Sequence, residues 1–263
     1  MIHANDFTFC GSKLSDFDYI IADIDNSSSV ENSSCGNLEM LTERPVLSKK
    51  DISHGFQYGE GITISFQIVK IDKLFHVPTP VTNAEFEHIM RWLVRPTYNY
   101  ITFDTDNDLF FHVKIKVDAI KIGSILHGFE LTLTNDSAYG YSKEYITRIG
   151  NHGTGYLEDV SSLVGYTYPK LKISIVDSGT YTLTNDLEPN RYLRISNCTA
   201  GEVITIDCEN KTIKSTKPNH DLSKDFNFTF FRFLNTYENN LNRITSANGS
   251  VDMTYRFTRM VTI

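Results

Sequence analysis

The stretch GEVITIDCENKTIKS, residues 201–215, decides the fold class of the chain. Ile204, Ile206 and Cys208 alternate with their neighbours at the two-residue period of an extended strand. Glu209-Asn210 then supplies a turn before the chain returns through Lys-Thr-Ile-Lys. This order predicts a β-hairpin.

A second stretch, FNFTFFRFL at residues 226–234, predicts a strand with an aromatic row facing a core. The residues expected in that row are Phe226, Phe228, Phe230 and Leu234. Asn248-Gly249 then predicts a tight turn before the last strand, which contains Tyr255-Arg256.

The order ITIDxxNxTI, FxFxFFRF and NxITxxNGSV resembles the C-terminal domain of phage distal tail proteins, a family from long-tailed, non-contractile bacteriophages. The amino terminus is similar to the family's opening hairpin, with FTF at residues 7–9, Gly11, LSDF at 14–17 and YII at 19–21. Each motif is only a strand-and-turn pattern, so the resemblance depends on their order and spacing.

Composition places the chain among folded proteins. Its 263 residues are 40% hydrophobic and 22% charged, and the 12% of aromatic residues favours β-structure. The net charge of −7 argues against nucleic-acid recognition. Because no run approaches the ~20 apolar residues of a membrane-spanning helix, we expect no membrane insertion. The amino terminus lacks the pattern of a secretory signal, so we expect the chain in the host cytoplasm during assembly and in the virion afterwards.

The first half of the sequence predicts several strands and one helix. Residues 7–25 predict a hairpin, 26–37 an exposed polar loop, 38–47 a further strand that ends near Pro45, and 61–71 the clearest strand. Thr82 and Glu85 have the spacing of a capping box and predict a helix over residues 82–94. Its apolar stripe contains Phe86, Ile89, Met90, Leu93 and Val94. Trp92 falls off this stripe, so it either covers a core edge or meets a partner.

We therefore predict a mainly β protein of two domains. Residues 1–138 form an N-terminal β-sandwich or barrel-like domain with one α-helix. Residues 139–263 form an antiparallel β-sandwich, because short strands recur there with turn signals at even spacing. The resemblance implies that this second domain is galectin-like.

No catalytic, cofactor-binding or metal-binding residue is predicted. The acidic turn at residues 104–108 lacks the glycine and the closing glutamate of a calcium loop. Nucleophile, zinc and phosphate-loop motifs are absent, so we expect no enzyme. The cysteines form no C-x-x-C pair, and Cys198 and Cys208 are expected as reduced strand residues.

The resemblance implies a structural protein of the tail tip, forming a homo-hexameric ring that joins the tail tube protein to the tip or hub and to receptor-binding proteins. The surfaces expected to mediate assembly are residues 7–25, 26–37 and 82–94, although the second segment has the composition of a mere connecting loop as well. A related baseplate component of a contractile tail fits the same pattern.

An alternative is a carbohydrate-binding adhesion module that stacks sugars on Tyr166, Tyr168, Tyr181 or Tyr192. A cell-wall hydrolase is a third hypothesis, but it has no candidate residues.

Overall fold

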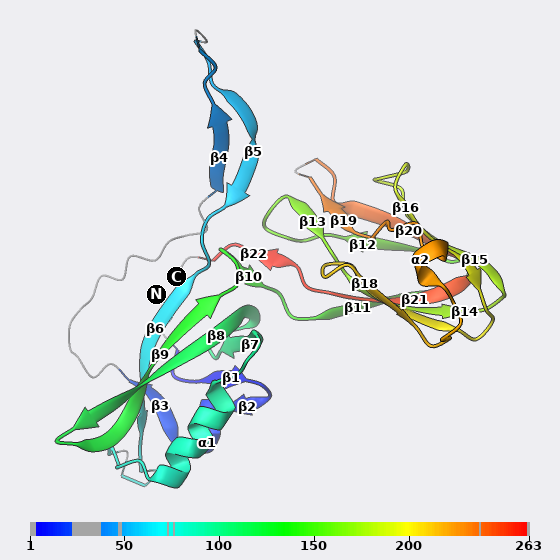
Figure 1. The fold of residues 1–263 in the computed structure, drawn as a ribbon. Coiled ribbons are helices and arrows are strands. Elements are labelled where there is room, and N and C mark those ends of the chain that lie inside the picture. Colours follow the sequence, from blue (N-terminus) through cyan, green and yellow to red (C-terminus); the bar gives the residue numbers. More distant parts are fainter. Residues whose placement is uncertain are drawn as a thin grey trace. The chain divides into compact units, whose positions relative to one another are not determined.

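The computed structural model describes residues 4–22, 38–46, 49–72, 74–75, 77–236 and 238–261. The chain forms two compact units, Met1–Tyr141 with Arg259–Ile263, and Ser142–Thr258 (Figure 1). Each unit has its own hydrophobic core. The sequence-based boundary lies between residues 138 and 139 and leaves the whole carboxyl terminus in the second domain, whereas the structure returns the last residues to the first unit.

The first unit contains one large antiparallel sheet and one separate hairpin. The hydrogen-bonded path of the sheet is β2-β1-β7-β8-β9-β6-β3, with β10 pairing to β8 beside it. Its strands are β1 (Phe7–Phe9), β2 (Ser12–Lys13), β3 (Tyr19–Ala22), β6 (Thr63–Lys70), β7 (Asn99–Phe103), β8 (Asp106–Ile122), β9 (Ile125–Asn135), β10 (Gly140–Tyr141) and β22 (Thr258–Arg259). The separate hairpin consists of β4 (Leu38–Glu43) and β5 (Ile52–Tyr58).

The two edges of this sheet are joined by a very short connection. Only the 3-10 helix η1 (Leu14–Phe17) and Asp18 separate β2 from β3, which lie at opposite ends of the path. A flat sheet of seven strands would place its edges about 29 Å apart. Six residue steps cover at most about 22 Å even when fully extended. The sheet must therefore curl, and this gives the barrel-like shape expected from the sequence.

Helix α1 (Asn83–Leu93) packs one face against the core of the curled sheet. Its capping box forms as predicted, since the Thr82 backbone N–H donates to Glu85 Oε2 at 2.8 Å and the Glu85 N–H donates to Thr82 Oγ1 at 3.4 Å. Ile89, Trp92 and Leu93 are the buried helix residues. Val94 was expected in the apolar stripe but is the C-cap, with 47% of its surface exposed.

The sequence left open whether Trp92 covers a core edge or meets a partner, and the structure places it in the core. Its ring stacks on Phe7 and Phe17, with centroids 5.6 and 4.4 Å away, and its Nε1–H donates to the carbonyl of Phe9 at 3.0 Å. Only 6% of its surface is exposed. Trp92 therefore belongs to the core, where it ties α1 to β1.

The second unit is a sandwich of two antiparallel sheets. One has the order β11-β21-β14-β17-β18 and the other β12-β20-β15-β16, and a short pair β13-β19 lies beside them. The elements are β11 (Tyr145–Ile149), β12 (Thr154–Glu158), β13 (Gly165–Thr167), β14 (Lys170–Ile175), β15 (Gly179–Asn185), β16 (Tyr192–Cys198), β17 (Val203–Asp207), β18 (Thr212–Ser215), α2 (Leu222–Asp225), β19 (Phe233–Asn235), β20 (Leu241–Ala247) and β21 (Gly249–Tyr255).

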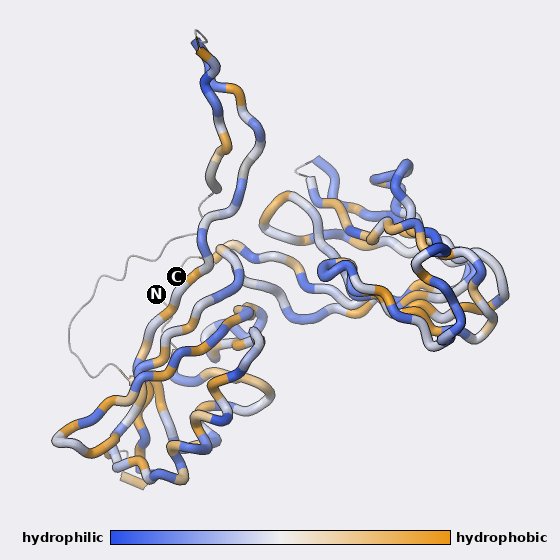
Figure 2. The backbone as a smooth tube through the Cα atoms, viewed as in Figure 1, coloured by the Kyte–Doolittle hydropathy of each residue, from blue (hydrophilic) through white to orange (hydrophobic). Residues whose placement is uncertain are grey.

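The sandwich follows the alternation seen in the sequence. The predicted hairpin is β17-β18, with Ile204, Ile206 and Cys208 buried. The predicted turn at Asn248 connects β20 to β21, in which every second residue is buried. Gly249 is required there, because a Cβ would lie 2.8 Å from the carbonyl oxygen of Ser174. Figure 2 shows the corresponding alternation of hydrophobic and hydrophilic residues along the strands.

The aromatic stretch 226–234 differs from the prediction. Only Phe233–Asn235 is a strand, and the buried aromatic residues are Phe226, Phe231 and Phe233. Phe228 is 63% exposed and has a φ of 54°, which breaks the alternation. The reason is local: Asn227 bonds with both its backbone and its side chain to the edge of β16, so the chain must turn directly after it.

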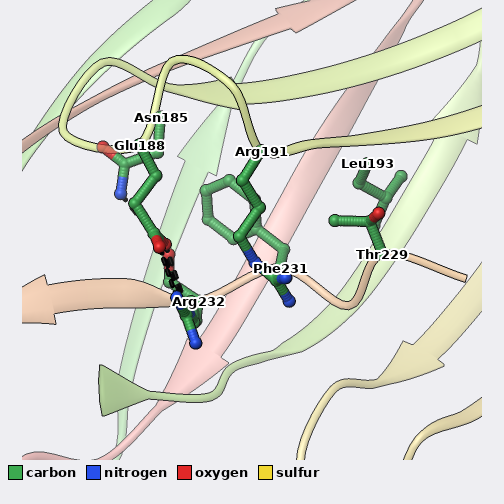
Figure 3. A pocket seen from close by; sticks show the side chains of 7 residues that line it. All are labelled: Asn185, Glu188, Arg191, Leu193, Thr229, Phe231 and Arg232. Carbon is green, nitrogen blue, oxygen red and sulfur yellow. Dashed lines mark hydrogen bonds and ion pairs between the residues drawn. The ribbon is translucent and has the colours of Figure 1, made fainter. Parts of the chain in front are cut away.

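An ion pair fixes the same stretch to the connection between β15 and β16. Arg232 Nε donates to both carboxylate oxygens of Glu188, at 2.9 and 3.2 Å, and its terminal nitrogen pairs with the same carboxylate (Figure 3). The guanidinium also lies 3.5 Å from the ring centroid of Tyr166. Less than a fifth of either charged side chain is exposed, so solvent screens the pair only weakly.

We predict that Trp92→Ala lowers the free energy of unfolding by about 3–5 kcal/mol, because it leaves a large cavity between α1 and β1. Urea unfolding followed by circular dichroism measures this loss. Val94→Ala, at the exposed end of the same helix, is the matched control and should cost less than about 0.5 kcal/mol. Equal losses for the two variants would contradict the assignment of Trp92 to the core.

We predict that Glu188→Gln destabilises the second unit by about 1.5–3 kcal/mol at pH 7. Hydrogen bonding to Arg232 outweighs burial and holds the pKa of Glu188 below its usual value of 4.5. A lowered folded-state pKa gives stability that is present above pH 4.5 and lost as the pH falls through the folded-state pKa. The difference between variant and wild type should therefore shrink in acid.

Urea unfolding at pH 7 and pH 3 tests this. The control is Asp186→Asn in the same connection, whose exposed pair with Arg243 should contribute less than about 1 kcal/mol. A cost of Glu188→Gln that is independent of pH would show that the carboxylate charge is not the stabilising group.

Candidate assembly surfaces

The first predicted assembly segment, residues 7–25, lies mostly inside the first unit. Phe7, Phe9 and Tyr19 are at most 2% exposed. The described part of this segment also exposes polar residues, among them Lys13, Ser15 and Asp16. It supplies both end strands of the sheet path, β2 and β3, and Ile20 of β3 is 38% exposed. Asp16 Oδ2 accepts the backbone N–H of Lys13 at 2.8 Å in front of η1.

The other two predicted segments have different outcomes. Residues 26–37 lie outside the described part of the chain, so the proposal that they meet a neighbour stays a prediction. Helix α1 buries one face and leaves Glu87, His88 and Arg91 exposed on the other. This exposed face is polar and charged, like the rim of a typical interface.

The hairpin β4-β5 is a more prominent surface that the sequence analysis only half identified. Residues 38–47 were predicted as a strand, but the partner strand β5 was missed. The signal was present, since a polar segment with Pro45 separates 38–43 from a second β-favouring run at 52–58. The two strands pair with each other and form a two-stranded sheet of their own (Figure 1).

The side chains of the β4-β5 hairpin are exposed and partly apolar. Exposed fractions are 57% for Met40, 42% for Leu41, 93% for Val46 and 50% for Ile52. Because successive residues of a strand point to opposite faces, Met40 and Leu41 expose apolar surface on both faces. An isolated two-stranded hairpin is marginally stable in water. The hairpin therefore has the properties of an element that packs against another chain.

A second apolar surface lies at one end of the large sheet. Ile122 and Ile125 flank the turn between β8 and β9 and are 56% and 51% exposed. The connection from β6 to α1 passes the same end, where the Val81 N–H donates to the carbonyl of Leu126 at 2.8 Å. This connection exposes Leu74 and Phe75 by 77% and 72%. These residues are an additional candidate contact surface.

The described residues of the second unit offer a small hollow and several exposed tyrosines. The hollow lies between Asn185, Arg191, Thr229 and the Glu188–Arg232 pair, and its volume of about 10 Å³ fits one water molecule (Figure 3). It does not have the size of a sugar-binding pocket.

The four tyrosines proposed for sugar stacking have different environments. Tyr181 is fully buried and donates to or accepts from Ser246 Oγ at 3.0 Å, so it cannot stack on a ligand. Tyr166 is 50% exposed but carries the Arg232 guanidinium over its ring, Tyr168 is partly buried, and Tyr192 is 42% exposed. Sugar binding at these positions stays an untested prediction.

The described part of the chain holds few groups of side chains that are arranged like a reactive or metal-binding site. Among these residues there is no group of three or more His, Cys, Asp or Glu side chains that could hold a metal ion. The acidic turn is held by its neighbours, since Asp104 Oδ1 accepts the N–H of Asn5 and Asp106 Oδ1 that of Asp108. Cys198 and Cys208 are buried and free, and burial raises the pKa of their thiols to about 11 and 12. None of the described helices is long and apolar enough to cross a membrane.

Comparison with known proteins identifies the family. A model of a phage tail protein N-terminal domain matches residues 2–137, and a model of a phage tail C-terminal domain matches residues 138–257. No curated protein matches the chain.

Among solved structures, the chain is similar to the Dit protein of phage SPP1, described as a paradigm of the hub adsorption apparatus of phages that infect Gram-positive hosts. The TM-score is 0.63 at 12% sequence identity, and the match covers 97% of this chain and 99% of that one. This likeness confirms the predicted mainly β fold. The chain thus belongs to a family of phage tail proteins, structural components of the virion, and has the fold of a distal tail protein.

Proposed function

We propose that the chain is a non-enzymatic structural protein of the tail tip, which assembles into a ring of six copies and joins the tail tube to the hub and receptor-binding proteins. Assembly takes place in the host cytoplasm, and the ring remains in the virion. The likeness to SPP1 Dit over nearly the whole length of both chains supports this proposal.

The observation that carries the ring proposal is the β4-β5 hairpin. It exposes apolar residues on both faces and forms a two-stranded sheet of its own. A closed ring needs a head-to-tail contact in which an element of one subunit binds a different surface of the next. A protruding hairpin that is marginally stable alone fits the first half of such a contact. We therefore assign β4-β5 as the element that binds the neighbouring subunit.

The apolar end of the sheet fits a different role. Ile122, Ile125, Leu74 and Phe75 are exposed apolar residues on two segments of the first unit, and these segments are joined by the bond from Val81 to Leu126. Apolar residues gather at the centre of interfaces rather than at their polar rims. We assign this end to contact with a tail component other than the hairpin of the next subunit.

We expect purified protein to form a closed ring. Six chains of 30.0 kDa give a particle of about 180 kDa with an open centre. Multi-angle light scattering measures the mass, and negative-stain images of the same sample show the shape. A protein that stays monomeric over a wide concentration range, both alone and with purified tail tubes as a template, would contradict the ring.

We expect the double variant Met40→Glu with Leu41→Glu to abolish the ring while leaving a folded chain. Two carboxylates per subunit would be buried without partners in the contact, and this costs more than an interface of ordinary size can tolerate. Light scattering reports the mass and circular dichroism reports the fold. The matched control is Ile146→Glu, which replaces a 69% exposed apolar residue of the second unit and should leave the ring intact. A double variant that assembles like wild type would exclude the hairpin from the contact.

A further inference from the structure

The second unit contains a buried histidine between two carboxylates. The side chain of His220 is 3% exposed, and that of its partner Glu202 is 0% exposed. His220 precedes α2, and Glu202 ends the turn between β16 and β17. Nδ1 of His220 lies 2.6 Å from Oε1 of Glu202. Such a pair, almost fully removed from water, is costly unless every group in it has a partner.

Both ring nitrogens of His220 face hydrogen-bond acceptors. Nδ1 faces the Glu202 carboxylate, while Nε2 lies 3.0 Å from the carbonyl oxygen of Ser196 and 3.4 Å from Oδ2 of Asp225. A carbonyl oxygen can only accept, and a neutral imidazole has only one N–H. The arrangement is satisfied only when the pair holds one additional proton, and with Glu202 ionised this makes His220 an imidazolium.

The charges around the imidazole favour that proton. Glu202 faces it from the β16–β17 turn and Asp225 from the end of α2. The Cys198 thiol at the end of β16 is uncharged at neutral pH, because burial raises its pKa to about 11. On the segment that carries His220, Lys217 is exposed and Lys224 pairs with Asp221 at 2.8 Å. Within the described residues, no cationic side chain therefore forms an ion pair or a hydrogen bond with the imidazole.

This cluster bridges the open edges of the two sheets. Ser196 belongs to β16, the last strand of the four-stranded sheet, and Ser215 belongs to β18, the last strand of the five-stranded sheet. Glu202 accepts from the Ser215 hydroxyl, and His220 bonds the Ser196 carbonyl. The chain from Ser215 to Glu202 to His220 to Ser196 thus connects both edge strands, and residues 216–225 cover them.

We propose that one proton on His220 holds this side of the sandwich closed, and that its loss at higher pH releases residues 216–225 and uncovers the edge of β18 and the carboxyl end of β16. A deprotonated imidazole keeps one N–H, so one of its two nitrogens would present a lone pair to an acceptor. That nitrogen would be either Nδ1, which faces the carboxylate, or Nε2, which faces the carbonyl. An exposed strand edge is a template for pairing with another chain, so the proton also controls access to these edges.

The direction of the pKa changes agrees with the geometry. Burial alone would lower the pKa of His220, but the hydrogen bond and the charge of Glu202 outweigh it and raise the pKa above 6.5. Burial would raise the pKa of Glu202, but bonds from Ser215, His220 and Thr199 lower it below 4.5. The stability from His220 is complete below pH 6.5 and is lost as the pH rises through its folded-state pKa. That from Glu202 is present above pH 4.5 and is lost in acid.

The first test is the protonation state of His220 in the full chain. Long-range ¹H–¹⁵N spectra of the histidine rings should show His220 with both nitrogens protonated at pH 6.5, with its resonance assigned through the backbone. Amide signals of residues 216–225 should shift at higher pH with the same midpoint. A neutral His220 ring at pH 6.5 or below would overturn the proposal.

The second test is the pH dependence of stability. Trp92 is the only tryptophan and lies in the first unit, so its fluorescence reports that unit, while circular dichroism reports the whole chain. The urea midpoint of the second unit should fall between pH 6 and pH 9 in wild type and stay level in His220→Gln. Each pH unit by which folding raises the pKa gives a tenfold change in the unfolding constant.

Two controls separate the role of the proton from a general effect on packing. His152→Asn replaces an exposed histidine of the same unit whose φ of 52° asparagine tolerates, and it should keep the wild-type pH dependence. The Trp92 transition should respond to pH equally in all variants. If His220→Gln retained the full fall between pH 6 and pH 9, another group would carry the effect and the proposal would be wrong.

Discussion

The architecture depends on which groups form hydrogen bonds with the edge strands of the sheets. Every edge strand presents unpaired N–H and C=O groups, and these groups must be covered, paired or left to another chain. In the first unit, η1 joins β2 to β3 and forces the sheet to curl. In the second unit, Asn227 and the residues beside it bond to β16, and the segment before α2 contacts the end of β18 through Lys217 and Ser215. The hairpin β4-β5 pairs with no other described strand of its own unit.

Buried asparagine side chains supply hydrogen bonds to segments of the chain that are not in a regular strand. Asn242 is fully buried, and its amide accepts from Asn185 and Leu234 and donates to the carbonyls of Leu234 and Asn240. Asn135 similarly binds the N–H of His112 and the carbonyls of Ser137 and Tyr139. One amide side chain can thus replace the ladder bonds that an irregular segment lacks. These residues fix the paths of the segments that follow β9 and precede β20.

Local patterns predicted the elements whose causes are local. The capping box defined the start of α1, and alternation defined β17, β18 and β21. Two features that the sequence left open or predicted wrongly depend on distant partners. Trp92 is buried although it lies off the periodic stripe, because the curled sheet brings Phe7 and Phe17 to it. The row of phenylalanines is broken because Asn227 bonds to a strand more than 30 residues earlier. No pattern within a short window contains that information.

The candidate assembly surfaces show the same division between local and distant causes. The segments chosen from sequence were those nearest to recognised motifs, and the first of them is occupied by the core of its own unit. A residue pattern that makes a strand amphipathic cannot tell whether its apolar face meets the same chain or another one. In the described structure, β1 pairs with β7 and packs on α1. The strands β4 and β5 pair only with each other, although Tyr58 of β5 also contacts the ring of Tyr139.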